Sequence, residues 1–316
     1  MADPELRHLR YLMAVANHAN FTRAAEALHI SQPTLSQQIK QLERILGVQL
    51  LDRTGRVVRL TDAGTVYSEH ARRILRDLAA GERAVNDVQD LSRGHLRLGL
   101  TPTFTAYLIG PLTAEFNRRH PGITLAIREM SQDRIEAALL AGELDLGIAF
   151  AGSHLPGITA RSWFTEVLSL VTCSTNRQSM PKILPVKALE TTELALLSED
   201  FATRNHIDAY FARHDIAPRI TVEATSIQAL TEIVQRSPLA TVLPEAITHD
   251  HLQLAPVPVD PPLSARTAAL LRRQGAYESA AARAFSEAAY DFSQTRGYDQ
   301  SPFTSGSGGR GVSIRP

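Results

Sequence analysis

The sequence has a single cysteine, Cys173, among 316 residues. One cysteine excludes an intramolecular disulfide and any cysteine-rich zinc site. Because Cys173 ends the apolar run 167–173, we expect a buried strand thiol there, with a redox sensor as the alternative. Long apolar stretches are also missing: none approaches the roughly twenty residues that cross a bilayer, and no signal peptide precedes the first amphipathic helix. These absences predict a cytoplasmic protein that makes no contact with a membrane.

An excess of charge of one sign is lacking too. The chain has 33 basic and 33 acidic residues and a formal net charge of zero, so no global field draws it towards nucleic acid. Residues 31–60 differ, with five cations against two anions and a local excess of three: Lys40, Arg44, Arg53, Arg56 and Arg59 against Glu43 and Asp52. Such a local excess is compatible with phosphate contacts. The length predicts about two domains.

Two short helices joined by a tight turn are predicted over residues 21–47. The second has an apolar face at helical spacing, made of Leu35, Ile39, Leu42 and Leu46. A separate face carries Gln37, Lys40, Gln41 and Arg44. Ser31 suits the N-cap, Pro33 the first turn and Gly47 the end of this helix. An ordinary αα-hairpin has similar periodicity, but a helix-turn-helix that reads the major groove needs this division between packed and hydrogen-bonding faces.

A helix over about residues 6–17 precedes this pair, and helical spacing places four residues in its core face: Leu6, Leu9, Met13 and Ala16. After the pair, residues 48–51 and 57–60 are expected to form a two-stranded wing around a basic, glycine-containing turn. Arginines there suit phosphates or a narrow minor groove, although each alone fits a solvated loop. We predict DNA contacts for Ser31, Gln32, Pro33, Thr34, Ser36, Gln37, Lys40, Arg53 and Arg56.

The segment 21–64, FTRAAEALHISQPTLSQQIKQLERILGVQLLDRTGRVVRLTDAG, resembles the N-terminal domain of LysR-type transcriptional regulators. That family shows the pattern A-A-x-x-L-x-x-S-Q-P-x-L-S-x-x-I-x-x-L-E-x-x-L-G-x-x-L-F-x-R, then a basic wing and T-x-A-G. Leu51 stands where phenylalanine is usual, and Gln37 where many members carry arginine. Since arginine favours guanine and glutamine favours adenine in the major groove, the base preference of those members is not carried over. The resemblance extends to about residue 292 and implies double-stranded promoter DNA as a partner.

Thr61 is a suitable cap for a long helix that extends to about residue 91. Apolar residues recur there at alternating steps of four and three: Tyr67, Ala71, Ile74, Leu78, Gly81, Val85 and Val88. A helix docked on its own domain is the simpler explanation of this seam. In the LysR family, however, the equivalent linker helix pairs two subunits. The resemblance therefore implies a dimer on an inverted-repeat site, with a tetramer as the usual assembly, RNA polymerase as a further partner and activation as the common mode.

Beyond residue 92 the pattern alternates between strands and helices, as in a largely parallel sheet with helices on its faces. Strands are expected at 96–100, 123–130, 144–150, 167–173, 193–197, 220–222, 240–243 and 266–272, and helices at 107–119, 132–141, 206–214, 226–235 and 277–292. This arrangement resembles the two-lobed, periplasmic-binding-protein-like effector domain of the family. The expected domains are a winged helix-turn-helix at 1–60, a linker helix at 61–91, the α/β effector domain at 92–296 and a flexible tail at 297–316. Lobe I comprises 92–163 and 267–296, and lobe II comprises 164–266.

Ligands of such folds bind beyond the carboxyl ends of strands, in the crevice between lobes. Hydroxyl and amide side chains follow predicted strands or open the next helix, and helix amides there can hold a small anion. As helix caps alone, Thr103 and Ser131 already have a structural explanation. The family holds its effector with these segments, which gives five candidates: Thr101, Thr103, Ser131, Gln132 and Thr203.

Four segments, TPTFTAYLIGPL, EMSQDRIEAAL, ELDLGIAFAGSH and LSEDFATRNHID, are similar to the branch of the family that controls cyanate detoxification. This similarity implies cyanate or a similar small anion as the inducer, with another small organic acid as the alternative. No cofactor and no metal site are expected. An enzyme is not expected either, because catalytic and phosphate-binding motifs are missing, and a stand-alone solute-binding protein would not need the recognition helix.

Overall fold

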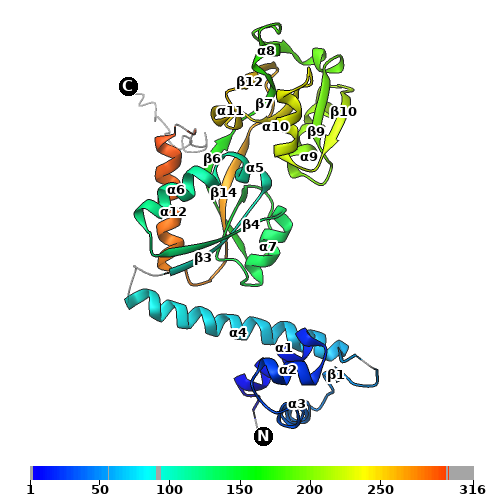
Figure 1. Cartoon of the computed structure of the whole chain (residues 1–316), viewed down its shortest axis with the longest axis vertical. Helices are drawn as coiled ribbons and strands as arrows, with labels where there is room; N and C mark the ends of the chain where they lie inside the picture. Colours follow the sequence, from blue (N-terminus) through cyan, green and yellow to red (C-terminus); the bar gives the residue numbers. More distant parts are fainter. Residues whose placement is uncertain (1–2, 56, 90–93, 297, 299–316) are drawn as a thin grey trace, which may run out of the picture. The chain divides into compact units, whose positions relative to one another are not determined.

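The structure, a computed structural model, describes residues 3–55, 57–89, 94–296 and 298. The chain divides into two compact units, Met1–Gln89 and Asp90–Pro316 (Figure 1). The first unit contains α1 (Leu6–His18), α2 (Phe21–Ala27), α3 (Gln32–Leu46), β1 (Leu51–Asp52), β2 (Arg59–Leu60) and α4 (Asp62–Gln89). No helix of the described residues is long and apolar enough to cross a membrane.

Local capping signals fix the helices of the first unit. The Ser31 side chain accepts a hydrogen bond from Thr34 N–H at 3.2 Å, and α3 ends at Gly47 with φ of 68°. The predicted core face of α3 is confirmed, because Leu35, Ile39 and Leu42 are fully buried and Leu46 packs against the same cluster.

The predicted core face of α1 is wrong in part. Leu9 is buried, but Leu6 is 43% exposed, and the fully buried residues are Leu12, Val15 and the polar His8. The buried stripe is therefore rotated along the helix towards α2, α3 and α4, which contact α1. Leu6 is the first residue of α1, where no neighbouring helical turn covers it.

The long helix α4 begins where the sequence indicates. Thr61 Oγ1 accepts a hydrogen bond from Gly64 N–H at 3.0 Å and donates to Gln49 O at 2.8 Å, which ties the helix to the wing. Its apolar seam is shared between two environments. Ala71 is buried and Tyr67 packs on the core of the first unit, whereas Ile74 and Val85 are exposed.

Lobe I of the second unit and its crossovers contain β3 (Gly94–Leu100), α5 (Pro102–Tyr107), α6 (Ile109–Arg119), β4 (Ile123–Glu129), α7 (Gln132–Leu140), β5 (Leu146–Phe150), β6 (Ile158–Glu166), β14 (Arg266–Arg273) and α12 (Ala280–Thr295). They form a five-stranded sheet in the order β4-β3-β5-β14-β6. β3 is parallel to β4 and β5, while β14 is antiparallel to β5 and β6. The parallel part agrees with the predicted alternation. β6 was not predicted.

Lobe II contains β7 (Leu168–Cys173), α8 (Ser174–Arg177), β8 (Leu184–Pro185), the 3₁₀ helix η1 (Val186–Glu190), β9 (Glu193–Leu197), α9 (Ala202–Arg213), β10 (Arg219–Ala224), α10 (Ile227–Gln235), β11 (Thr241–Pro244), α11 (Ile247–Asp250), β12 (Leu254–Val257) and β13 (Val259–Asp260). Its sheet is not largely parallel, contrary to the prediction, because β7 pairs antiparallel with both β11 and β12. The parallel pair β9–β10 extends it through a bridge between Leu194 and Ala240.

Both lobes contribute to one apolar cluster, in which Phe104 and Leu108 of lobe I pack with Ile227 and Leu243 of lobe II. The strands β6 and β14 lie side by side and lead from one lobe to the other (Figure 1). Because the lobes share this apolar cluster and are connected by the paired strands β6 and β14, the ends of β5, β6 and β14 lie at the junction between the lobes.

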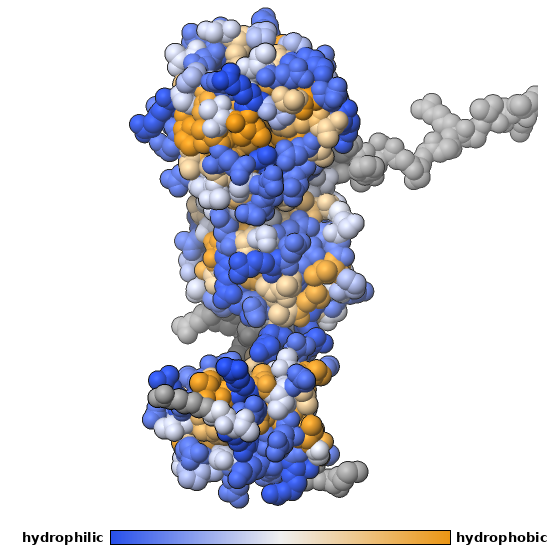
Figure 2. Space-filling model, turned by 90° about the vertical axis from the view of Figure 1, so that its right-hand side faces the viewer, coloured by the Kyte–Doolittle hydropathy of each residue, from blue (hydrophilic) through white to orange (hydrophobic). Residues whose placement is uncertain are grey.

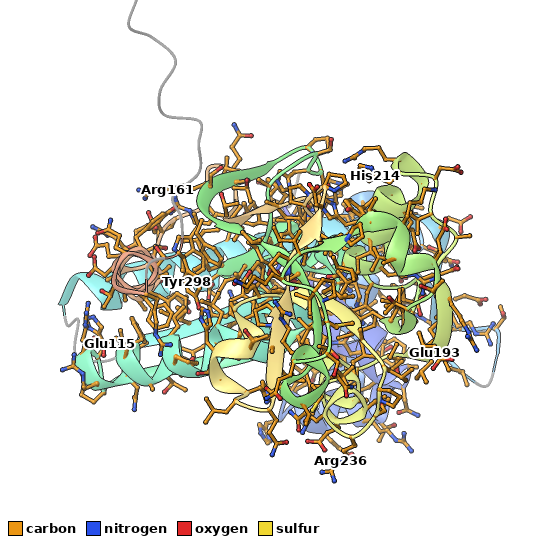
Figure 3. All side chains as sticks on the ribbon, turned by 90° about the horizontal axis from the view of Figure 1, so that it is seen from above. Glu115, Arg161, Glu193, His214, Arg236 and Tyr298 are labelled. Carbon is orange, nitrogen blue, oxygen red and sulfur yellow. The ribbon has the colours of Figure 1, made fainter. Side chains whose placement is uncertain are left out.

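Two residues depart from expectation. Cys173 is not a buried thiol: it is partly exposed at the end of β7, and hydrogen bonds from Thr175 lower its pKa. Tyr298 belongs to the predicted tail, yet its ring stacks on Phe164 with a centroid distance of 4.9 Å. Tyr298 is half-buried, and Figure 3 labels it away from the edge of the view, with Glu115 and His214 nearer the edge. The remainder of the predicted tail, 297 and 299–316, lies outside the described residues.

Candidate nucleic-acid interface and effector cleft

The polar face of α3 is exposed within the first unit. Because Leu35, Ile39 and Leu42 hold the helix on its core, the opposite side faces solvent. Its start, from Ser31 to Thr34, is exposed, as are Gln37 and Lys40, while Ser36 is half-buried. The hydroxyls of Ser31 and Thr34 lie 2.7 Å apart. The helix therefore presents hydroxyl, amide and ammonium groups along one side, the groups that bind base edges and phosphates.

Arg53 is held inside the first unit rather than free on the wing. Its Nη2 donates to Glu43 Oε2 at 2.8 Å, and its guanidinium lies 5.2 Å from the centre of the Phe21 ring. Glu43 Oε1 also accepts hydrogen bonds from Leu50 N–H and Leu51 N–H. This cluster fixes the chain between α3 and the wing, so Arg53 has a structural role beside its predicted DNA contact.

The two strands of the wing pair antiparallel, Leu51 with Leu60 and Asp52 with Arg59. Arg59 is exposed on β2. Arg56, which the sequence predicts at the tip, lies outside the described residues. Among the described wing residues, Arg59 is thus the cation that faces solvent.

In the second unit, the end of β5 links two of the predicted effector residues. Thr101 N–H donates to Ile148 O at 3.2 Å, and Phe150 N–H donates to Gln132 Oε1 at 3.2 Å. Thr101 and Thr103 are both buried, with their hydroxyls 3.4 Å apart. Ser131 caps α7 without a side-chain hydrogen bond and is exposed. Thr101, Thr103 and Gln132 therefore gather at the carboxyl ends of the lobe I strands, with Ser131 at the surface.

A buried ion pair at the lobe junction reaches the fifth predicted residue. Arg266, at the start of β14, pairs with Glu166, at the end of β6, and its Nη1 donates to Thr203 Oγ1 at 3.1 Å. Tyr107 O–H donates to the other oxygen of Glu166 at 2.9 Å. The guanidinium also lies 3.9 Å from the centre of the Phe150 ring. The cluster thus joins both lobes and both crossover strands.

Burial governs the protonation of this cluster. It raises the pKa of Glu166, against the opposing effects of Arg266 and Tyr107. Burial and the adjacent Glu166 also raise the pKa of Tyr107 well above its ordinary value, so Tyr107 remains a hydrogen-bond donor. Arg266, Glu166 and Tyr107 are not among the site residues predicted from the sequence. The available signal was a charged residue next to apolar ones at a strand end, Glu166 after Trp163 and Phe164 and Arg266 before the run 268–271, because buried charges need partners.

A second network holds Gln132 in place. Its Nε2 donates to Glu136 Oε1 at 3.2 Å, and His154 Nδ1 lies 2.8 Å from the same oxygen. Leu155 N–H donates to Glu136 Oε2 at 2.8 Å. These contacts connect α7 to the segment that leads into β6. They are positioning contacts for Gln132, since Glu136 and His154 are almost fully buried.

A cavity of about 480 Å³ opens between α5 of lobe I and α10 and α11 of lobe II. Its walls include Pro102, Thr105 and Glu129 from lobe I and Phe201, Thr225 and Gln228 from lobe II. None of the five predicted effector residues lines it, although Pro102 lies between Thr101 and Thr103 in sequence and Phe201 is two residues from Thr203. Among the described residues, no group of three or more His, Cys, Asp or Glu could hold a metal ion.

Comparison with known proteins covers both units. The sequence model of the bacterial regulatory helix-turn-helix protein, lysR family, matches residues 6–65, and that of the LysR substrate binding domain matches residues 89–293. The nitrogen assimilation regulatory protein nac of Klebsiella aerogenes is 34% identical over 242 residues, 76% of this chain and 78% of that protein. The hydrogen peroxide-inducible genes activator of Dickeya chrysanthemi is 29% identical over 273 residues, 85% and 90% of the two chains.

Solved structures show the same fold. Full-length OxyR from Pseudomonas aeruginosa has a TM-score of 0.71 at 24% identity, with 92% of this chain and 95% of that chain covered. Full-length CbnR complexed with its target DNA has a TM-score of 0.65 at 24% identity, with 91% and 99% covered. Because the two sequence models together match both units, the chain belongs to the LysR family of DNA-binding transcriptional regulators with an effector-binding domain.

Proposed function

We propose that this regulator responds to a small anion, with cyanate as the first candidate, and controls an operon for cyanate detoxification. The observation that carries the anion is the buried guanidinium of Arg266, which donates to Thr203 from the junction between lobes. Thr101 and Thr103 add hydroxyls from lobe I. An anion bound there shares the donors of Arg266 with Glu166, and therefore competes with an existing ion pair.

We further propose that two copies pair through the part of α4 that its own unit leaves uncovered. Ile74 and Val85 are 48% and 63% exposed on that helix. Figure 2 shows apolar patches among the polar groups of one face of the chain. Exposed apolar residues at seam spacing are stabilised by a partner helix. Two-fold pairing then presents two copies of α3 to an inverted repeat. A dimer of dimers and contact with RNA polymerase at the promoter complete this proposal.

A second candidate is a larger organic acid, which the volume of the cavity would accommodate although the charge of its described lining does not favour an anion. Sites for small organic molecules usually occupy about 300–1,000 Å³, and this cavity of 480 Å³ lies in that range. A triatomic anion fills little of this cavity, because small molecules of that order of size occupy little volume; a water molecule takes about 30 Å³. Relatives are named for nitrogen assimilation and for hydrogen peroxide, so members of this family serve different signals.

A thermal-shift screen of the full chain against cyanate, azide and organic acids separates the two candidates. A ligand at 100 times its dissociation constant stabilises the protein that binds it by about 2.7 kcal/mol. The expected result is stabilisation by cyanate that Thr203→Val weakens. A response to an organic acid without any response to cyanate rejects the cyanate proposal.

DNA binding is tested separately by fluorescence anisotropy on the promoter fragment beside the protein's own gene. Gln37→Ala is expected to weaken binding to that fragment by about 1–3 kcal/mol, the usual value of a bidentate base contact, and to leave binding to a scrambled fragment unchanged. Equal losses on both fragments would remove Gln37 from base recognition. Failure to retain any promoter fragment would refute the proposed control of an adjacent operon.

A further inference from the structure

We propose that the cavity between α5 and α10 binds a small organic molecule through a primary ammonium group, with the Glu129 carboxylate as its counter-ion. This inference rests on the proposed effector-sensing function of the cleft. It assigns a second subsite, because Thr101, Thr103, Ser131, Gln132, Thr203 and Arg266 do not line the cavity. The charge of this subsite is also opposite to that of Arg266.

The sign of the charge comes from Glu129. It is exposed at the end of β4; its backbone pairs with β3, but its carboxylate makes no hydrogen bond or ion pair with any described residue. No lysine or arginine occurs among the described residues that line the cavity. Arg128 is its neighbour in sequence, but successive residues of a strand point to opposite faces. A free carboxylate in a concave site without basic residues favours a cationic ligand.

The other walls suit an ammonium group on a short carbon chain. Phe201 offers an aromatic ring, which attracts cations to its face. Ala106, Ile227 and Ile247 provide apolar surface for methylene groups. Thr105 and Thr225 contribute hydroxyls that both donate and accept hydrogen bonds. These neutral groups orient the bound ligand, and Glu129 selects its charge.

Two features oppose a cation and are weaker than the carboxylate. The amino end of α10 borders the cavity at Ser226, and a helix terminus carries about half a positive charge. Ser226 already accepts a hydrogen bond from Ala229 N–H there. His251 is the remaining ionisable residue of the described lining, and its Nδ1 lies 3.5 Å from Gln235 Nε2. The full formal charge of Glu129 therefore outweighs the partial charge of the helix terminus.

A matched set of four-carbon probes tests this proposal on the full chain at pH 8 and constant ionic strength. The probes are 1,4-diaminobutane, 4-aminobutanoate and succinate, which each have four carbons and carry two ammonium ends, one ammonium and one carboxylate end, and two carboxylate ends, respectively. We expect the two amines to raise the melting temperature and succinate to leave it unchanged. Glu129→Gln should weaken amine binding by about tenfold or more, the loss expected for a charge-assisted hydrogen bond. Glu287→Gln, the same change on the exposed face of α12, should retain the full response.

Three results overturn the subsite: stabilisation by succinate equal to that by the amines, amine binding by Glu129→Gln as tight as wild type, or no response to either amine. If Glu129→Gln does not fold, Phe201→Leu removes the aromatic face with the apolar wall retained, and the amine response must fall. Promoter retention by the same preparation is scored separately. A protein that binds DNA and answers cyanate but not amines loses only this inference, whereas one that retains no DNA loses the proposed function.

Discussion

At the scale of single residues, Glu136 combines burial with a full set of hydrogen bonds. Burial alone would raise its pKa, but hydrogen bonds from His154, Leu155 N–H and Gln132 together lower it. A carboxylate with a lowered pKa in the folded state stabilises that state above its ordinary pKa. The stabilisation is lost as the pH falls through the folded value. Glu136 is thus a source of acid sensitivity in the second unit.

We expect Glu136→Gln to lower the free energy of unfolding at pH 7, with the deficit shrinking as the pH falls from the ordinary glutamate value of 4.5. Trp163 is the chain's single tryptophan and is buried in β6. Urea unfolding followed by its fluorescence therefore reports on the second unit. Glu287→Gln, which has no such network among the described residues, serves as the control and should follow wild type at every pH. A deficit that stays constant down to pH 3.5 would contradict the role of the ionised carboxylate.

At the scale of elements, two glycines of α4 have opposite surroundings. A Cβ atom on Gly64 would lie 1.9 Å from Leu50 O, whereas one on Gly81 would meet nothing within 4 Å. Gly64 therefore permits the close approach between α4 and the chain that leads into the wing. Gly81 is exposed and has no comparable packing in its own unit.

Gly64→Ala is expected to destabilise the first unit by about 1–3 kcal/mol or more, because the backbone must move to relieve the overlap. Gly81→Ala is expected to stabilise it by up to about 1 kcal/mol, since alanine is the better helix former. Thermal unfolding followed by far-UV circular dichroism measures both. Equal effects of the two substitutions would refute the close contact at Gly64.

Elements marked by local signals were predictable. Ser31 and Gly47 delimit α3, and Thr61 marks the start of α4, because capping depends only on neighbours in sequence. The buried stripe of α1 depends on where α2 and α3 dock, so its rotation was not predictable. The short strands β8 and β12 contain Pro185 and Pro256 and have no periodicity to detect.

The residues of the candidate effector cleft were also predictable only in part. Hydroxyls after strands, such as Thr101, could be located because topology alone brings strand ends together. The partners of Arg266 could not be, since Glu166 is 100 residues away in the chain and only the paired crossover strands bring them together. Tyr298 packs on Phe164 by an equally long-range contact, and its sequence neighbourhood, rich in glycine and serine, gives no sign of it.

At the scale of the whole molecule, each DNA contact of one protomer occurs twice in a two-fold assembly. Lys40 is exposed on the polar face of α3, three residues before Glu43, whose carboxylate is already bound by Arg53 and by two backbone N–H groups. Each lost phosphate contact reduces the slope of log affinity against log salt concentration by about 0.9. In a dimer with both copies of α3 on DNA, Lys40→Gln should reduce the slope by about 1.8, and in a fully engaged tetramer by about 3.6.

The measurement is a salt titration of promoter binding by wild type and Lys40→Gln over about 50–200 mM, where phosphate contacts dominate the change in affinity. Lys182→Gln provides the control, because it removes the same charge from an exposed position in lobe II. Its slope should equal that of wild type, since lobe II takes no part in the proposed interface. A reduction of only about 0.9 for Lys40→Gln indicates a single engaged helix and excludes an inverted-repeat site. An unchanged slope removes Lys40 from the phosphate contacts, and the exposed Arg59 on the wing is then the next cation to replace.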